Sequence, residues 1–227
     1  MDGVLATAIT STPLLFIDTA DHDLREMSTT SKGNLGEVTI TVNYVLDLIR
    51  NGVSPEHIAV ITPYSLQVEL LRSELYKNVS SDHLVSSLHG VCNKFIPVSQ
   101  DVDRDIKKAE PTSNAYYRNL EFEKGDSLNA DFGSRKSECF VEVGTVDSFQ
   151  GRQKQVVVIS LVRSNLDGKV GFLSDPRRLN VAVTRAQKQL VLIGDSTTLV
   201  QDKDLASLIK HMKNCGQTES GMSCDLH

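Results

Sequence analysis

Four short runs in this sequence are almost wholly apolar, and they alternate with segments whose apolar residues recur at helical spacing. The runs are Leu14–Ile17, Ile58–Ile61, Val156–Val162 and Leu190–Ile193. A strand without a polar side must be buried on both faces, which is typical of a parallel sheet covered by helices on each side. The alternation therefore predicts an α/β domain of three layers, built on a mostly parallel sheet.

Start and stop signals place helices between these runs. Asn34, followed three residues later by Glu37, resembles a capping box and predicts a helix that ends at Asn51-Gly52. Asp175-Pro176 predicts another start, because Asp accepts free N–H groups and Pro suits the first helical position. We expect the apolar face of that helix to reach Ala186. The remaining predicted elements are a helix beginning at Ser65, a helix over Leu205–Met212 that Gly216 ends, and a strand over Phe140–Val143.

Residues 80–139 have a different composition, dominated by Ser, Asn, Asp, Lys and Gly, and they lack alternating apolar runs. A loop of this length is uncommon inside a compact domain. We therefore expect an insertion that is mostly disordered, with a short helix near 101–109. The predicted domain is 13–213, interrupted by this insertion, with a flank at 1–12 and a flexible tail at 214–227.

Charge is unevenly spread along the 227 residues, which carry 24 Lys and Arg against 29 Asp and Glu. Between Gly144 and Leu190, eight basic residues stand against three acidic ones, whereas the first fifty residues have three basic and seven acidic residues. The net charge of −5 excludes a uniformly cationic surface for nucleic acid. It leaves room for a local basic groove in the second half of the chain.

Four cysteines without a CxxC pair favour a reducing compartment. No apolar run approaches the roughly 18 residues of a membrane helix, and the N-terminus lacks the basic residues of a signal peptide. We therefore expect a protein of the nucleus or cytoplasm that does not enter a membrane. His211, Cys215, Cys224 and His227 are four potential zinc ligands. A frayed helix end and a disordered terminus explain them better, and we expect no metal site.

Two arginines on the predicted helix after Asp175 indicate a phosphate-binding surface. Arg178 and Arg185 are seven residues apart, so we expect their guanidinium groups to lie on one helix face and project together toward the loop end of the sheet. Arginine binds phosphate bidentately and neutralises charge on a transferred phosphoryl group. The loop 145–153 follows a strand, at the edge where open α/β sheets bind ligands. The alternative is that these arginines are simply solvated.

The segments TVDSFQGRQ and DPRRLNVAVTRA closely resemble the last two signature motifs of superfamily-one helicases, and more narrowly those of the Upf-like group of the SMUBP type. Six further segments support the resemblance, in the order PLLFIDTA, SKGNLGEV, VITPYSLQVELLR, LVRSN, GKVGFL and IGDSTTL. It covers roughly 12–77 and 140–213. It implies a RecA-like domain of the P-loop NTPase type, the second of two in an ATP-dependent motor that moves 5′ to 3′ along single-stranded DNA or RNA.

The resemblance also implies roles for individual residues. Arg185 would be the catalytic arginine finger that reaches the γ-phosphate of ATP. Residues that would contact the nucleotide are Gln67, Gly151 and Gln153, to which the helical spacing adds Arg178. Residues that would face the nucleic acid are Thr145, Asp147, Arg163 and Asn165.

The chain departs from the family pattern in three places. Gln153 stands where the family usually has Glu, and it lacks the charge of that residue. Val68 follows Gln67 where the nonsense-mediated-decay helicase has an arginine. No G-x-x-x-x-G-K-[ST] motif occurs in the sequence, and no acidic pair for Mg²⁺ accompanies it.

The phosphate cradle and the Mg²⁺ ligands are therefore expected on a first RecA-like domain, either in a longer parent protein or supplied in trans. Without that domain, we expect this chain to be inactive as an ATP hydrolase. The alternative is a truncated, non-catalytic module that binds nucleic acid or a protein partner.

Overall fold

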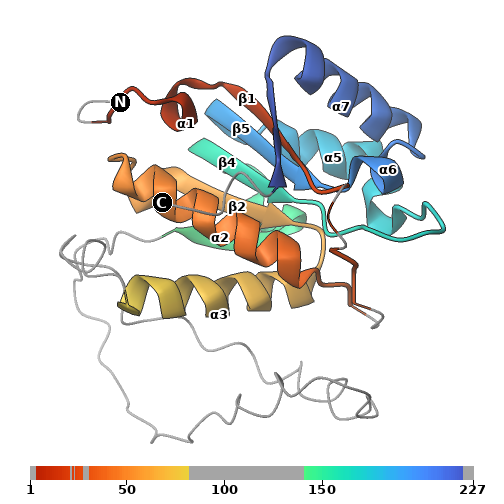
Figure 1. The fold of residues 1–227 in the computed structure, drawn as a ribbon, viewed down its shortest axis with the longest axis horizontal. Helices are drawn as coiled ribbons and strands as arrows, with labels where there is room; N and C mark the ends of the chain where they lie inside the picture. Colours follow the sequence, from red (N-terminus) through yellow and green to blue (C-terminus); the bar gives the residue numbers. More distant parts are fainter. Residues whose placement is uncertain (1–3, 21, 23, 28–30, 82–140, 222–227) are drawn as a thin grey trace, which may run out of the picture. The chain divides into compact units, whose positions relative to one another are not determined.

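A six-stranded sheet forms the centre of the computed structural model, in the order β3-β2-β4-β5-β1-β6 (Figure 1). Every neighbouring pair of strands is parallel. The structure describes residues 4–20, 22, 24–27, 31–81 and 141–221, which belong to one compact unit. The strands are β1 (Leu14–Asp18), β2 (Ile58–Thr62), β3 (Glu142–Thr145), β4 (Lys154–Ser160), β5 (Ala186–Gly194) and β6 (Gln217–Ser220).

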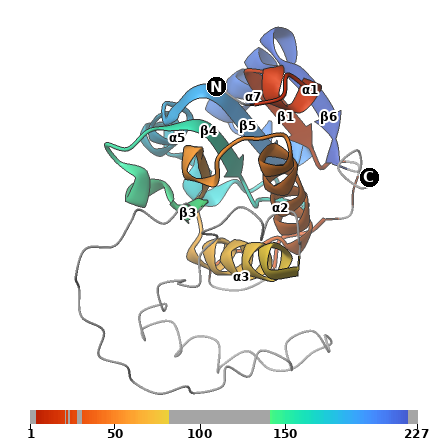
Figure 2. The ribbon, with the colours of Figure 1, turned by 90° about the vertical axis from the view of Figure 1, so that its left-hand side faces the viewer.

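Helices cover both faces of the sheet (Figures 1 and 2). One face carries α1 (Ala8–Ser11), α2 (Leu35–Arg50) and α3 (Ser65–Ser81), and the other carries α5 (Pro176–Val183), α6 (Ser196–Leu199) and α7 (Lys203–Cys215). Three short 3-10 turns complete the described elements, namely η1 (Pro55–His57), η5 (Val146–Phe149) and η6 (Gly171–Ser174). In the part of the chain that the structure describes, no helix is long and apolar enough to cross a membrane.

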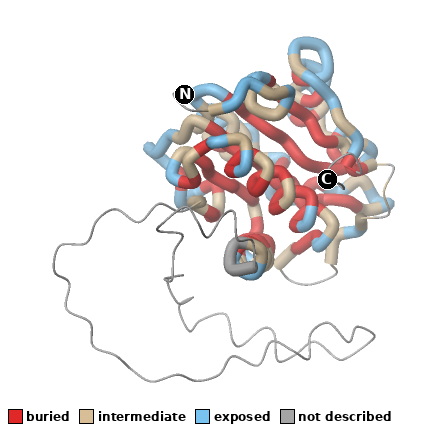
Figure 3. The backbone as a smooth tube through the Cα atoms, turned by 60° about the vertical axis from the view of Figure 1, so that its left-hand side comes forward, coloured by how far each residue is buried: buried red, intermediate tan, exposed pale blue. Residues whose placement is uncertain are grey.

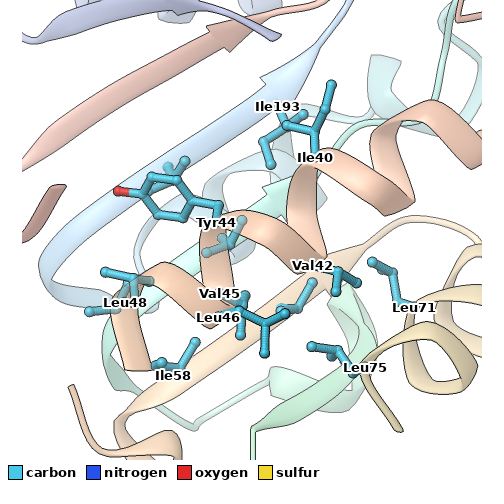
Figure 4. Packing of buried hydrophobic residues seen from close by; sticks show 14 of the residues in the cluster. Ile40, Val42, Tyr44, Val45, Leu46, Leu48, Ile58, Leu71, Leu75 and Ile193 are labelled. Carbon is cyan, nitrogen blue, oxygen red and sulfur yellow. The ribbon is translucent and has the colours of Figure 1, made fainter. Parts of the chain in front are cut away.

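Alternate side chains of each central strand divide between two cores. In β4, Val156 and Val158 pack with α2 and α3, whereas Val157 and Ile159 pack with α5 and α7. Figure 4 shows the first core, where side chains of α2 and α3 meet at the sheet around Ile58. The central strands are buried along most of their length (Figure 3), which explains why their sequences have no polar side.

The predicted three-layer α/β class with a parallel sheet is confirmed. Asn34 and Asp175 are helix N-caps, as expected from their side-chain chemistry. The helix after Asp175 is shorter than predicted, because it ends at Val183 and Ala186 already belongs to β5. The strand expected over Phe140–Val143 lies further along the chain, as β3.

The segment predicted as a flexible tail contains a strand, which corrects that expectation. β6 pairs with β1, with Leu15 opposite Gln217 and Asp18 opposite Ser220. The strand is polar and largely exposed, so hydrophobic patterning gives no signal for it. The predicted insertion 80–139, apart from the end of α3, and the short helix near 101–109 lie outside the described residues.

Candidate functional site

The predicted site residues lie at two opposite edges of the sheet. The chain leaves the carboxyl end of β3 at Thr145, crosses β2 through η5, and reaches the amino end of β4 at Lys154. The α5 helix also runs from the carboxyl edge back to the amino edge, since β5 begins just after it. Residues near the start of the loop 145–153 are therefore separated from those near its end.

At the amino edge, Arg185 is fixed against the loop that precedes β4. Its Nε donates to the carbonyl oxygen of Val181 at 2.8 Å, and its Nη1 donates to the carbonyl oxygen of Arg152 at 3.3 Å. The Nη2 group donates to Thr184 Oγ1 at 3.1 Å. A guanidinium group has five N–H donors, so two of them have no partner among the described residues. We call Gly151, Arg152, Gln153 and Arg185 the amino-edge group.

The rest of the amino-edge group forms an open surface. Gly151 has a φ of +78°, and no heavy atom beyond its two chain neighbours lies within 4 Å of the position that a Cβ would take. Gln153 is exposed, and its Oε1 accepts a hydrogen bond from Gln187 Nε2 at 3.3 Å. Arg152 forms an ion pair with Glu142. Backbone and side-chain donors are thus accessible beside Arg185.

Arg178 does not lie with Arg185, and the expectation that the two guanidinium groups project together is wrong. A helix of eight residues is about 12 Å long, and Arg178 occupies its first turn. The Nε of Arg178 is 4.0 Å from Asp147 Oδ1 and 3.9 Å from Asp175 Oδ2. Arg185 follows the end of the helix instead of continuing its face.

An open hollow of about 500 Å³ lies at the carboxyl edge. We call it the carboxyl-edge hollow. Thr145 and Asp147 line a smaller cavity that shares Phe172 and Arg178 with it. The residues that line the carboxyl-edge hollow are Lys32, Tyr64, Arg163, Gly171, Phe172, Ser174, Asp175 and Arg178.

Glu26 organises two of the predicted nucleic-acid residues, Arg163 and Asn165. Its Oε2 lies 2.7 Å from Arg163 Nε, and it accepts hydrogen bonds from Asn165 Nδ2 at 3.1 Å and from the backbone N–H of Ser164 at 3.2 Å. Arg163 also donates to Tyr64 Oη at 3.2 Å. No sequence pattern marks Glu26 as a site residue, since it stands in a polar stretch without periodicity.

Gln67 lies inside the domain, at the end of α3 that faces the carboxyl edge. Its Oε1 accepts from the backbone N–H of Asn34 at 2.8 Å. Its Nε2 donates to the carbonyl oxygen of Asn34 at 3.2 Å and to Ser160 Oγ at 2.9 Å. The side chain is fully buried. It joins α2, α3 and β4, and its predicted contact with a nucleotide stays a prediction.

Glu37 extends this buried network to the end of β4. Its Oε2 accepts from Ser160 Oγ at 2.7 Å and from the backbone N–H of Val162 at 2.8 Å. Its Oε1 has no partner among the described residues. Burial raises the pKa of the Glu37 carboxyl to about 8, although the two hydrogen bonds to Oε2 act in the opposite direction. The carboxyl does not complete the predicted capping box, because it turns into the core.

Asp195, just after β5, holds the loop that follows β4 and carries Arg163. It accepts hydrogen bonds from Ser164 Oγ at 2.8 Å and from Thr198 Oγ1 at 2.9 Å, and it caps α6. Burial alone would raise the pKa of Asp195, but the hydrogen bonds from Thr197, Ser164 and Thr198 outweigh it and hold the pKa below its usual value. The loop that carries Arg163 is therefore held by carboxyl groups from three parts of the chain, of which Glu37 and Asp195 are buried.

The parallel sheet with a helix-covered core on each face is an α/β fold of the RecA-like class. A family model described as "AAA domain" matches residues 4–197. The chain belongs to this family, as a superfamily-one helicase domain of the Upf-like group.

Curated relatives agree with this membership. DNA-binding protein SMUBP-2 of Rattus norvegicus is 33% identical over 223 residues, which cover 97% of this chain and 17% of that protein. DNA polymerase alpha-associated DNA helicase A of Schizosaccharomyces pombe is 30% identical over 207 residues, 88% of this chain and 22% of that protein. Regulator of nonsense transcripts 1 of Dictyostelium discoideum is 31% identical over 202 residues, 89% of this chain and 11% of that protein. The chain thus spans less than a quarter of the length of each of these relatives.

Proposed function

We propose that this chain is the second motor domain of an ATP-dependent helicase that moves 5′ to 3′ along single-stranded DNA or RNA. One observation carries the proposal. Arg185 is fixed by hydrogen bonds to Val181, Arg152 and Thr184, and two of its N–H donors have no partner among the described residues, next to the open backbone of Gly151 in the sequence segment that Arg185 contacts. A pre-oriented arginine of this kind suits an arginine finger, which stabilises the charge that develops on a transferred phosphoryl group.

The chemistry of the amino-edge group supports the proposed binding of ATP. Arg185 would donate to the γ-phosphate, Gly151 would let backbone approach the nucleotide, and Gln153 would hydrogen-bond a ribose hydroxyl. Bound ATP with Mg²⁺ supplies the phosphoanhydride whose hydrolysis drives the motor. Gln67 lies at the opposite edge of the sheet, where its buried amide joins Asn34 to Ser160 at the end of β4, so its part in nucleotide binding would be indirect.

The carboxyl edge supports nucleic-acid binding. We propose that the single-stranded nucleic acid passes over Thr145, Asp147, Arg163 and Asn165. We add Arg178 to this surface, because its guanidinium lies at the same edge. Contacts of arginine to phosphate tolerate any sequence and weaken as salt is added. Asp147 would orient Arg178 and would not itself contact phosphate.

The amino-edge group is one side of a nucleotide site. The phosphate cradle and the Mg²⁺ ligands would come from a first RecA-like domain, in the same longer protein or as a partner. The relatives are several times longer than this chain, which agrees with such an arrangement. We place the assembled motor in the nucleus or cytoplasm.

The test is ATP turnover by this chain assembled with a first RecA-like domain, in the presence of single-stranded nucleic acid. We expect Arg185→Ala to lower turnover by about 10³-fold or more. Arg177→Ala is the matched control, since Arg177 is an exposed arginine on α5 that belongs neither to the amino-edge group nor to the lining of the carboxyl-edge hollow. Unchanged turnover in Arg185→Ala would remove the arginine-finger assignment. If the chain binds single-stranded nucleic acid but does not hydrolyse ATP together with any first RecA-like domain, it is a non-catalytic binding module instead.

A further inference from the structure

Phe172 is an exposed aromatic residue at the rim of the carboxyl-edge hollow. The residue is 57% exposed, although it stands beside the well-packed end of the sheet. Its ring makes an edge-to-face contact with Tyr64, with ring centroids 5.8 Å apart and planes inclined at 72°. The guanidinium carbon of Arg178 lies 5.1 Å from the centroid of the Phe172 ring. The ring is thus fixed on its edge and flanked by a cation.

The backbone before Phe172 holds the ring in this exposed position. Gly171 has a φ of +58°, which favours glycine. A Cβ at Gly171 would lie 2.7 Å from Arg163 Nη1 and 2.9 Å from Tyr64 Oη. The η6 turn then buries Leu173 in the core. Close packing before and after Phe172 therefore leaves its own side chain directed outward.

The charges around Phe172 identify the chemistry of a ligand. Lys32, Arg163 and Arg178 line the hollow. Their carboxylate neighbours are Glu26, within 4 Å of Lys32 and Arg163, and the pair Asp147 and Asp175 beside Arg178. A purely apolar ligand would not need three cations at its rim, and a bare phosphate would not need an exposed ring. An anionic ligand that also offers a flat π-face satisfies both features.

We propose that Phe172 and Arg178 form a stacking platform for one unpaired base of the bound strand, with the neighbouring cations facing its phosphates. This inference rests on the proposed binding of nucleic acid at the carboxyl edge and adds the base contact. Stacking tolerates any sequence, because every base has a π-face. Bases in a duplex are already stacked on one another, so the platform selects single strands.

The experiment compares the affinity of this chain and its variants for a short fluorescent single-stranded oligonucleotide at low salt. We expect Phe172→Ala to weaken binding by roughly 10-fold. Phe172→Leu, which keeps an apolar side chain without a ring, should lose nearly as much, and Phe172→Tyr should bind as tightly as the wild type. Tyr76→Ala is the matched control, because Tyr76 is an aromatic residue of similar exposure on α3.

An oligonucleotide with abasic sites separates a stacking role from a structural one. If Phe172 stacks on a base, the loss caused by Phe172→Ala should almost vanish on the abasic strand. An equal loss on both strands would overturn the platform, since it would show that the ring only supports the fold. Equal binding by the wild type and Phe172→Ala would also overturn it, while leaving the proposed function standing. Failure of the wild type to bind any single strand would overturn both.

Discussion

The Oε2 atom of Glu37 accepts a hydrogen bond of 2.8 Å from the backbone N–H of Val162, which lies 125 residues further along the chain. Val162 has a φ of +71°, an unfavourable conformation for a β-branched residue that costs about 1–3 kcal/mol. Asn34 holds the next peptide group, since its Nδ2 donates to the carbonyl oxygen of Val162 at 3.2 Å. The first turn of α2 therefore stabilises the sharp bend that brings Arg163 to the carboxyl edge.

The raised pKa of Glu37 predicts that this domain loses stability as pH rises. The unfolded chain releases this proton near the ordinary value of 4.5, whereas the folded chain retains it up to about pH 8. Between these values the folded state binds more protons, so the free energy of unfolding falls with pH, by up to about 1.4 kcal/mol per pH unit. Glu37→Gln imitates the protonated carboxyl, and it should flatten this dependence. Urea unfolding of both proteins across this range checks the prediction, and parallel curves for the two proteins would contradict it.

Removing Glu26 should destabilise the domain because Arg163 would keep its charge in a buried position. The side chains of Glu26 and Arg163 are each 10% exposed, and breaking a buried pair on one side costs about 3–5 kcal/mol. We expect Glu26→Ala to lose an amount near the lower end of that range. The double variant Glu26→Ala/Arg163→Met should recover part of the loss, since it removes both charges. Thermal unfolding of these two variants and of Arg163→Met measures the coupling, and simple additivity of the two single losses would refute it.

The two edges of the sheet should respond separately to loss of their arginines. Arg178→Ala should reduce the slope of log affinity against log salt for a single strand by about 0.7, the contribution of one phosphate contact. It should leave the KM for ATP of the assembled motor unchanged. Arg185→Ala should leave that slope unchanged and impair ATP turnover. If Arg178→Ala instead raises the KM for ATP, Arg178 belongs to the nucleotide, as its spacing in the sequence indicated.

Gln153→Glu should strengthen nucleotide binding. A carboxylate at this position still accepts the hydrogen bond from Gln187, and it adds the charge that the family pattern usually has there. Charge-assisted hydrogen bonds are about twice as strong as neutral ones, so we expect the KM for ATP of the assembled motor to fall a few-fold. Turnover at saturating ATP should not change. Gln201→Glu serves as the charge control, because Gln201 is an exposed glutamine that follows α6, at the opposite edge of the sheet.

Local signals in the sequence predicted the framework of the fold. Asn34 and Asp175 were identifiable because an N-cap depends only on the next few residues. The strands β2, β4 and β5 were identifiable because a strand buried on both faces has no polar side. These features need no knowledge of distant residues.

The geometry of the site depends on distant residues, and the sequence predicted it less well. Glu37 stands three residues after a helix cap, so the local pattern predicted a capping role for it. Its contact with Val162 depends on the end of β4, which is distant in the sequence. The spacing of Arg178 and Arg185 fits one helix face only if the helix continues, and it ends at Val183 because the chain must turn into β5. Glu26 acquires its role solely from the loop that it meets in three dimensions.

The polar strand β6 also protects the chain from aggregation. Without it, the apolar residues of β1 would form a sheet edge with unpaired backbone groups, a ready template for pairing with another molecule. In its place, β6 presents Gln217, Thr218, Glu219 and Ser220, a short and hydrophilic border that recruits further strands poorly. A chain shortened before Gln217 should therefore keep its helices and its central strands, yet it should precipitate at concentrations where the longer chain stays in solution.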